Sequence, residues 1–123
     1  MKSLKEILII DDDSKNIFAL SAVLKARKYS CVSALSAQEG LTKLKNNKNI
    51  GVVLMDMMMP EMDGYEAIAK MKADADLRHI PVIAITAQAM TGDREKCLEA
   101  GADGYISKPV DVDELLQQLN KIF

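Results

Sequence analysis

The chain has 123 residues, which is enough for one domain with a single hydrophobic core. Hydrophobic residues make up 49% and charged residues 28%, the composition of a globular protein rather than a disordered one. The formal net charge is -2, and no run of Lys and Arg is long enough to follow a phosphate backbone, so we expect no direct binding to nucleic acid.

The N-terminal residues MKSLKEILII contain one short apolar run, which three aspartates follow at once. This run is too short for a membrane span and lacks the form of a signal peptide. The two cysteines, Cys31 and Cys97, lack the spacing of a metal or redox site, so we expect both to be buried and reduced. These features predict a cytoplasmic protein that does not associate with membranes.

Five short apolar runs rich in Ile and Val alternate with longer segments of helical period. The runs cover residues 6–10, 29–35, 51–55, 82–86 and 104–107, and the helical segments cover 14–28, 36–46, 64–74, 91–103 and 111–123. Two capping boxes, Ser36 with Glu39 and Asp111 with Glu114, support the helix starts, and Gly101 suits a left-handed helix end. Unbroken apolar strands need cover on both faces, so we predict one doubly wound α/β domain: a five-stranded parallel sheet with helices on both faces.

Polar side chains follow four of the five predicted strands. In such sheets, ligands bind outside the carboxyl ends of the strands. The first strand ends in Asp11, Asp12 and Asp13, the third in Asp56, the fourth in Thr86, and the fifth in Ser107, Lys108 and Pro109. Carboxylates, one hydroxyl and one ammonium therefore converge on one rim of the sheet.

Crowded carboxylates repel one another unless a cation neutralises them. Oxygen ligands without a nearby His or Cys favour a hard divalent ion, so we expect Mg²⁺, or Mn²⁺ in its place. Such a site suits phosphoryl transfer, in which three equatorial oxygens each need a partner. The metal, the Lys108 ammonium and the Thr86 hydroxyl can supply these partners, with Asp56 as the nucleophile and an acyl phosphate as the product.

Four segments together closely resemble the receiver domain of bacterial two-component response regulators. They are ILIIDDDSKN, VVLMDMMMPEMDG, VIAITA and AGADGYISKP, in the family's order and spacing over essentially the whole chain. The resemblance implies the flavodoxin-like strand order 2-1-3-4-5 and Mg²⁺-dependent phosphorylation of Asp56 by a partner's phosphohistidine. It also implies a phosphorelay protein that is not a conventional enzyme, because such a domain catalyses only its own aspartyl phosphorylation and dephosphorylation.

By motif position, the resemblance implies which groups hold the metal. Asp12 and Asp56 would be direct ligands, Asp11 would act through a water molecule, and the Met58 backbone carbonyl would complete the protein share. Met58 and Gln88 also occupy positions that influence access of the hydrolytic water in the family. Since an apolar Met58 side chain cannot position that water, we expect slow self-dephosphorylation.

The resemblance assigns the switch to the last two strands, and we expect Thr86 and Tyr105 to end these neighbouring strands. Thr86 and Lys108 would sense the phosphate, Tyr105 would rotate inward behind Thr86, and the Lys108–Pro109 peptide bond is often cis in the family. We expect this motion to bias a surface formed by the fourth helix, the fifth strand and the fifth helix.

These residues also have purely structural interpretations. Asp11 and Asp12 can cap the first helix, and Asp13 can be a charge in its first turn. Lys108 can be a solvated lysine, and Tyr105 a half-buried strand residue. We expect Asp63 and Gly64 to form a turn and His79 to lie in a loop, without a catalytic role.

The main alternative is a small Mg²⁺-dependent phosphatase of the haloacid-dehalogenase type, because IIDDDSK also contains Asp-x-Asp after a first strand. In that interpretation Asp11 is the nucleophile and Asp13 the general acid or base. The absence of a cap insertion, and the Asp56 motif at the third strand, weigh against it. A flavodoxin-like electron carrier is a weaker alternative, because the loop after the first strand lacks the composition that cradles a cofactor phosphate. A degenerate receiver that serves only as a binding surface is also weaker, because the acidic residues of the site are all present.

We expect residues 1–123 to form a single receiver domain with no output domain, either free-standing or cut from a larger protein. The segments DDDSKN and AMTGDREKCLEAGADGYISKP resemble receivers attached to hybrid histidine kinases. The expected partner is therefore a sensor histidine kinase or a histidine phosphotransfer protein. The signal would leave either through the switch surface or by transfer of the phosphate.

Overall fold

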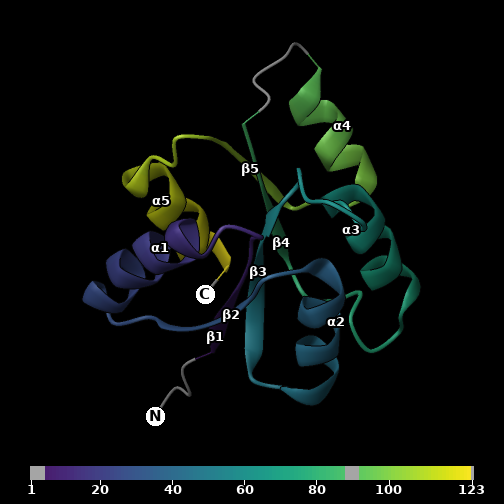
Figure 1. Cartoon of the computed structure of the whole chain (residues 1–123), viewed down its shortest axis with the longest axis horizontal. Helices are drawn as coiled ribbons and strands as arrows, with labels where there is room; N and C mark the ends of the chain where they lie inside the picture. The colour runs from purple at the N-terminus through teal and green to yellow at the C-terminus, as the bar shows by residue number, and fades with distance from the viewer. Residues whose placement is uncertain (1–4, 88–91, 123) are drawn as a thin grey trace.

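A five-stranded parallel sheet forms the centre of the computed structural model of the chain, which describes residues 5–87 and 92–122 (Figure 1). The strands are β1 (Glu6–Ile10), β2 (Ser30–Ala34), β3 (Ile50–Asp56), β4 (Val82–Thr86) and β5 (Gly104–Ser107), in the order β2-β1-β3-β4-β5. The helices are α1 (Ser14–Ala26), α2 (Ala37–Asn46), α3 (Gly64–Ala73), α4 (Asp93–Ala100) and α5 (Val112–Ile122). The predicted doubly wound fold and the strand order 2-1-3-4-5 are confirmed.

Helices cover both faces of the sheet. Figure 1 shows α1 and α5 on one side and α2, α3 and α4 on the other. Alternate residues of a strand serve the two sides: Leu8 and Ile10 of β1 pack in the core beneath α2 and α3, whereas Ile7 and Ile9 pack in the core beneath α1 and α5. Burial on both faces is why the strands appear in the sequence as unbroken apolar runs.

The two predicted capping boxes differ in detail from expectation. The Ser36 hydroxyl accepts the Glu39 N–H at 3.1 Å, and the Asp111 carboxylate accepts the Glu114 N–H at 3.2 Å. The Glu39 side chain, however, accepts the N–H of Leu35 at 3.0 Å, one residue before the cap. Both helices thus begin where the sequence predicted. In the first capping box, the Glu39 side chain accepts the N–H of the residue before the cap instead of the N–H of Ser36 itself.

Element bounds move by a few residues at their ends. Asp56 is the last residue of β3, as expected, so its backbone is held by a paired strand. The fourth helix begins at Asp93, two residues later than predicted, after Gly92 at φ +89°. Gly101 ends the same helix at φ +119°, the left-handed conformation that its position predicted.

The cysteines and His79 differ in their exposure. Cys97 is buried, but Cys31 is only half-buried, so the expectation of two buried thiols is wrong for Cys31; both thiols are free. His79 is exposed in a turn before β4, as expected. Within residues 5–87 and 92–122, no helix combines the length and the apolar character that crossing a membrane requires.

Candidate functional site

Three carboxylates meet at the carboxyl ends of β1 and β3. These strands are hydrogen-bonded neighbours, so Asp11, directly after β1, lies beside Asp56, the last residue of β3. One oxygen of each of Asp11, Asp12 and Asp56 lies within 4.8 Å of the others. Asp11 and Asp56 are each only 4% exposed, whereas Asp12 is exposed to solvent. The strand-end rule therefore brings together the three aspartates that the sequence singled out.

Asp13 caps α1 and leaves the other two aspartates free of that role. Its side chain accepts the N–H of Lys15 at 2.9 Å, so neither Asp11 nor Asp12 is needed as the helix cap. Asp11 is instead oriented by the loop, because it accepts the N–H of Asp13 at 2.8 Å and the side-chain amide of Asn16 at 3.4 Å. Asn16 was missed from the sequence; its only signal is a position one turn into the helix that follows the acidic run.

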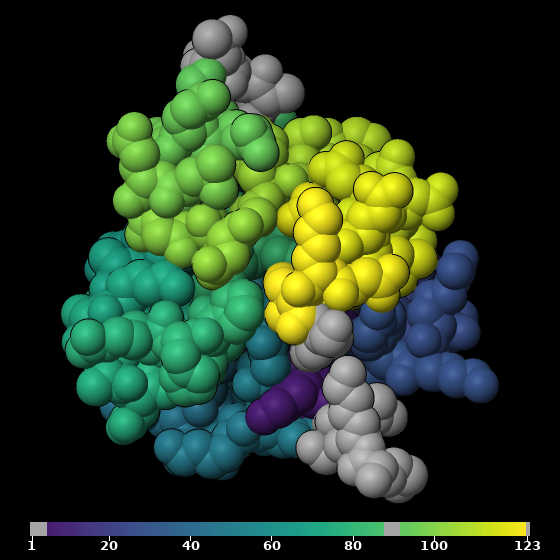
Figure 2. Space-filling model, turned by 180° about the vertical axis from the view of Figure 1, so that it is seen from behind, coloured from purple at the N-terminus to yellow at the C-terminus, as the bar shows by residue number. Residues whose placement is uncertain are grey.

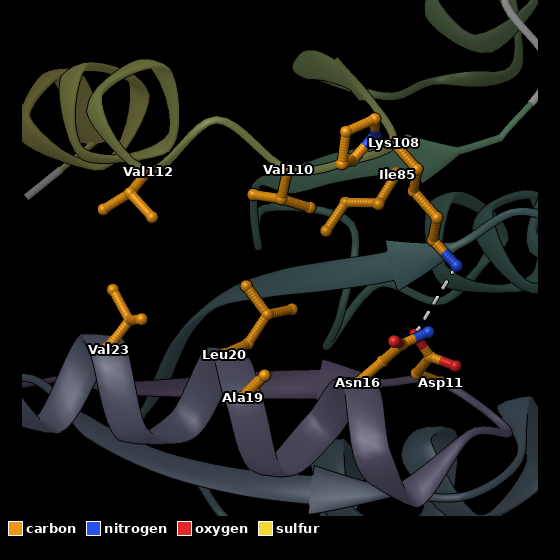
Figure 3. Close-up of a pocket in the computed structure, with 10 residues that line it drawn as sticks. Asp11, Asn16, Ala19, Leu20, Val23, Ile85, Lys108, Val110 and Val112 are labelled. Carbon is orange, nitrogen blue, oxygen red and sulfur yellow. Dashed lines mark hydrogen bonds and ion pairs between the residues drawn. The ribbon is translucent and has the colours of Figure 1, made fainter.

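Lys108 brings a positive charge to the same place from the end of β5. Its Nζ lies 3.8 Å from Asp11 Oδ2, as Figure 3 shows. The same Nζ lies 3.6 Å from Asp56 Oδ2. Its backbone N–H donates to the carbonyl of Thr86 at 2.8 Å, which fixes the loop to β4. The Lys108–Pro109 peptide bond is cis, as the resemblance implied. One ammonium faces three carboxylates, so the cluster carries an excess of negative charge.

The protonation of Asp56 reflects this excess. Burial raises the pKa of Asp56 above its ordinary value, and the charge of Asp11 raises it further, while the Met58 N–H, at 3.0 Å from Oδ1, and Lys108 lower it. Crowded oxygen ligands that one lysine does not neutralise fit a hard divalent cation such as Mg²⁺. The Met58 side chain is 49% exposed, and its backbone carbonyl as a metal ligand stays a prediction.

Thr86 and Tyr105 lie on the α4 side of the sheet but are not aligned as we expected. Thr86 ends β4 and is 1% exposed, whereas Tyr105 is the second residue of β5 and pairs with Ala84. The idea that both residues end neighbouring strands is therefore wrong for Tyr105; Ser107 is the partner of Thr86. The Tyr105 hydroxyl donates to Asp93 Oδ2 at 2.8 Å, a contact that the sequence did not predict.

The turn after Asp56 is closely packed. Asp63 caps α3 by accepting the Glu66 N–H at 2.9 Å, as its turn position suggested. A Cβ on Gly64 would lie 2.4 Å from the sulfur and 2.7 Å from the Cα of Met57, so only glycine fits there without movement. Gln88, proposed to influence hydrolysis, lies outside the described residues.

A cavity of about 560 Å³ adjoins the acidic cluster between α1 and the segment before α5 (Figure 3). Its polar end is formed by Asp11, Asn16 and Lys108. Leu20 and Val23 of α1 face Val110 and Val112 across its apolar part. The charged site therefore opens into an apolar groove rather than onto a flat surface.

Known proteins share both the sequence pattern and the fold of this chain. A family model described as response regulator receiver domain matches residues 7–120. The polar-differentiation response regulator DivK of Brucella ovis is 36% identical over 115 residues, which cover 94% of this chain and 93% of that protein. A response regulator receiver protein from Pseudomonas putida is 26% identical, with a TM-score of 0.91 over 98% of this chain and 99% of the other.

One solved structure bears on the metal. The receiver domain of the sensor histidine kinase PA1611 from Pseudomonas aeruginosa is 32% identical, has a TM-score of 0.87 over 98% of each chain, and holds a magnesium ion in its active-site cleft. Family members typically bind Mg²⁺ in an acidic site and work with histidine kinases or phosphotransfer proteins. They are signalling proteins rather than conventional enzymes, and these matches give the phosphatase alternative no support. The chain belongs to the response regulator receiver domain family and acts in phosphorelay signalling.

Proposed function

We propose that Asp56 accepts a phosphoryl group from the phosphohistidine of a partner protein. One observation carries the assignment: buried Asp56 shares a site with the Asp11 and Asp12 oxygens within 4.8 Å and with the Lys108 ammonium at 3.6 Å. In the transfer, an Asp56 carboxylate oxygen forms a bond to phosphorus as the bond between phosphorus and the histidine nitrogen breaks, and the imidazole leaves. The product is an aspartyl phosphate on β3.

Mg²⁺, or Mn²⁺ in its place, would be held by Asp12 and Asp56, by Asp11 through water, and by the Met58 carbonyl. When bound, the cation offsets the excess negative charge of the cluster and of the incoming phosphate. Lys108 lies within reach of both buried carboxylates, so its ammonium can pair with a phosphate oxygen once the acceptor carries the group. Thr86, buried at the end of the adjacent strand, offers a hydroxyl to a further oxygen.

The proposal also covers how the signal leaves the domain and how long the aspartyl phosphate lasts. Movement of Thr86 toward the phosphate would leave room behind it for Tyr105, which lies on the same side of the sheet. That change would reach the surface of α4, β5 and α5, or the phosphate would pass on to a phosphotransfer protein. With an apolar, half-exposed Met58 beside the acceptor, we expect slow loss of the phosphate. Rapid release in Mg²⁺ buffer would contradict this expectation.

Exposed apolar side chains on segments that follow the strands support a protein as the phosphodonor. Phe18 on α1 is 77% exposed, Leu35 after β2 is 52% exposed, and Met58 after β3 is 49% exposed. All three lie on segments that follow strands of the sheet at its carboxyl edge. Contact with a partner protein would remove these apolar side chains from water, which favours binding. We also propose a cytoplasmic location, which the free thiols of Cys31 and Cys97 support.

The test uses the whole chain, acetyl phosphate and Mg²⁺, with intact mass as the readout. We expect one added phosphate on the wild type, none with EDTA, and none on Asp56→Asn. Asp113→Asn, an exposed aspartate in α5, is the matched control and should react like the wild type. Equal phosphorylation of Asp56→Asn would overturn the proposal. A phosphate mapped to Asp11 by peptide analysis would instead favour the phosphatase mechanism.

A second comparison tests the partner. Phe18→Ala should slow transfer from a phosphohistidine protein but leave the reaction with acetyl phosphate unchanged, because only the protein donor needs the apolar contact. Equal slowing with both donors would contradict a docking role for Phe18.

A further inference from the structure

A third buried carboxylate, Asp93, lies outside the acidic cluster. It is the first residue of α4 and is 6% exposed. Its Oδ1 accepts the hydroxyl of Tyr65 from α3 at 3.2 Å, and its Oδ2 accepts the hydroxyl of Tyr105 from β5 at 2.8 Å. One side chain thus joins three elements that are separate in the sequence.

Asp93 lies at the N-terminus of α4. A carboxylate in the first turn of a helix is stabilised by the helix dipole, and Gly92 before it supplies no side-chain cap. Burial, followed by the bond to Asp93 and its charge, raises the pKa of Tyr105 to about 12, so the hydroxyl keeps its proton and acts as a donor at neutral pH. Cys97, one turn along α4, lies 3.7 Å from the Tyr65 hydroxyl, and Lys96 lies over the Tyr65 ring. The Tyr65 ring is therefore packed from the same helix.

Tyr105 also borders the surface between α4 and α5. It lines a hollow of about 240 Å³ together with Leu98 of α4 and Gln118 of α5, and both helices lie on the face seen in Figure 2. The Gln118 side chain donates to the Tyr105 backbone carbonyl at 3.1 Å. A change of the Tyr105 rotamer thus alters the wall of this hollow while the backbone stays held.

We propose that Asp93 is a latch that holds Tyr105 in the rotamer of this structure, and that this latch must open before the chain adopts its phosphorylated conformation. This inference rests on the proposed function, because it concerns the switch of that same site. Rotation of Tyr105 to another staggered rotamer moves its hydroxyl by several ångströms, so the 2.8 Å bond to Asp93 must break. A bond to a charged acceptor is stronger than a neutral one, so the latch opposes the switch.

The test measures the affinity of the whole chain for beryllofluoride with Mg²⁺, a phosphate mimic, by fluorine NMR. Tyr105→Phe removes the donor and Asp93→Asn removes the charge; each should bind beryllofluoride about tenfold more tightly than the wild type, within the usual range of coupling between sites. In the Tyr105→Phe background, Asp93→Asn should add little further affinity, because the hydroxyl that the charge holds is already absent. Tyr29→Phe, which loses a hydroxyl bonded to Asn120 instead, is the matched control and should bind like the wild type.

Ring-carbon NMR of the tyrosines provides a direct readout. Without beryllofluoride, Asp93→Asn should move the Tyr105 resonance toward its beryllofluoride-bound position and leave that of Tyr29 unchanged. Affinities within twofold of the wild type, weaker binding, or an unmoved Tyr105 resonance would overturn the latch while leaving the proposed phosphorylation intact. A wild type that binds no beryllofluoride would remove the proposed function and the latch with it. Should Asp93→Asn fail to fold, Tyr105→Phe alone decides by the same affinity criterion.

Discussion

Asp56→Asn is expected to stabilise the metal-free protein, although it removes the proposed phosphoacceptor. The Asp56 carboxylate is 4% exposed and lies within 4.8 Å of the Asp11 and Asp12 oxygens. Asparagine keeps the size of the side chain and an oxygen that can accept the Met58 N–H, but it removes the charge. The substitution therefore relieves repulsion without breaking the packing around β3.

The size of the effect follows from the neighbouring charges. Two like charges 4.8 Å apart repel by about 3.5 kcal/mol at an effective dielectric constant of about 20. Asp12 and Lys108 act on Asp56 with opposite signs and are more exposed than Asp11, so their contributions partly cancel. The attraction of Asp56 to Lys108 exceeds its repulsion from Asp12, so these two terms together offset part of the repulsion from Asp11. Removing the Asp56 charge should therefore raise the free energy of unfolding by about 2 kcal/mol, or Tm by roughly 5–10 °C.

Urea denaturation in EDTA measures this gain. Asp113→Asn, the exposed control, should change the free energy of unfolding by less than about 0.5 kcal/mol. If Asp56→Asn were no more stable than the wild type without metal, repulsion within the cluster would not outweigh the attraction to Lys108, and the reasoning would be refuted.

The same reasoning predicts the sign of a pH dependence. Burial, with the Asp11 charge, holds the pKa of Asp56 above its ordinary value, so between the unfolded and folded pKa values the folded chain binds more protons than the unfolded one. Through that window, the contribution of Asp56 to the free energy of unfolding falls as the pH rises. Asp56→Asn lacks this contribution, so its advantage should shrink as the pH drops below the folded pKa. An advantage that grows in acid would contradict the assignment.

Three further outcomes test other parts of the site. Lys108→Met should slow phosphorylation by acetyl phosphate by roughly 100-fold, the usual effect of losing one charge-stabilising donor, as followed by intact mass. Gly64→Ala should lower the free energy of unfolding by about 1–3 kcal/mol because its Cβ meets the Met57 backbone, whereas Gly104→Ala, which meets only the flexible Gln118 end, should be milder in the same urea assay. Mg²⁺ should raise the Tm of the wild type by several degrees but that of Asp12→Asn much less, in parallel thermal melts.

The sequence predicted the acidic cluster because its position depends on topology alone. Once the runs at 6–10 and 51–55 are recognised as parallel strands, Asp11 and Asp56 fall at the same edge of the sheet, and β1 and β3 are indeed neighbours. No side-chain rotamer needs to be known for that step. The layers of the fold were likewise predicted from the apolar runs, and the strand order from the resemblance to the family.

Contacts that depend on register and packing could not be predicted in this way. Tyr105 was expected at a strand end, yet it pairs with Ala84, two residues before Thr86. A shift of two residues along a strand preserves the face, so the apolar pattern carries no information about it. Asn16 and Asp93 were missed for a related reason: each lies at the start of a helix, where polar residues are common as caps, and only the folded chain shows what their side chains contact.

Asp56 and Asp93 are both buried carboxylates, but their surroundings suit them to different roles. Asp93 accepts two tyrosine hydroxyls at the N-terminus of α4, so both of its oxygens have partners within the protein. Asp56 accepts one backbone N–H, faces Asp11 and has a lysine only at 3.6 Å, so its charge is poorly compensated. An added cation and a transferred phosphoryl group improve the surroundings of Asp56 and offer nothing to Asp93. The carboxyl edge of the sheet therefore holds the proposed phosphoacceptor, and the carboxylate whose bonds are satisfied lies where α3, α4 and β5 meet.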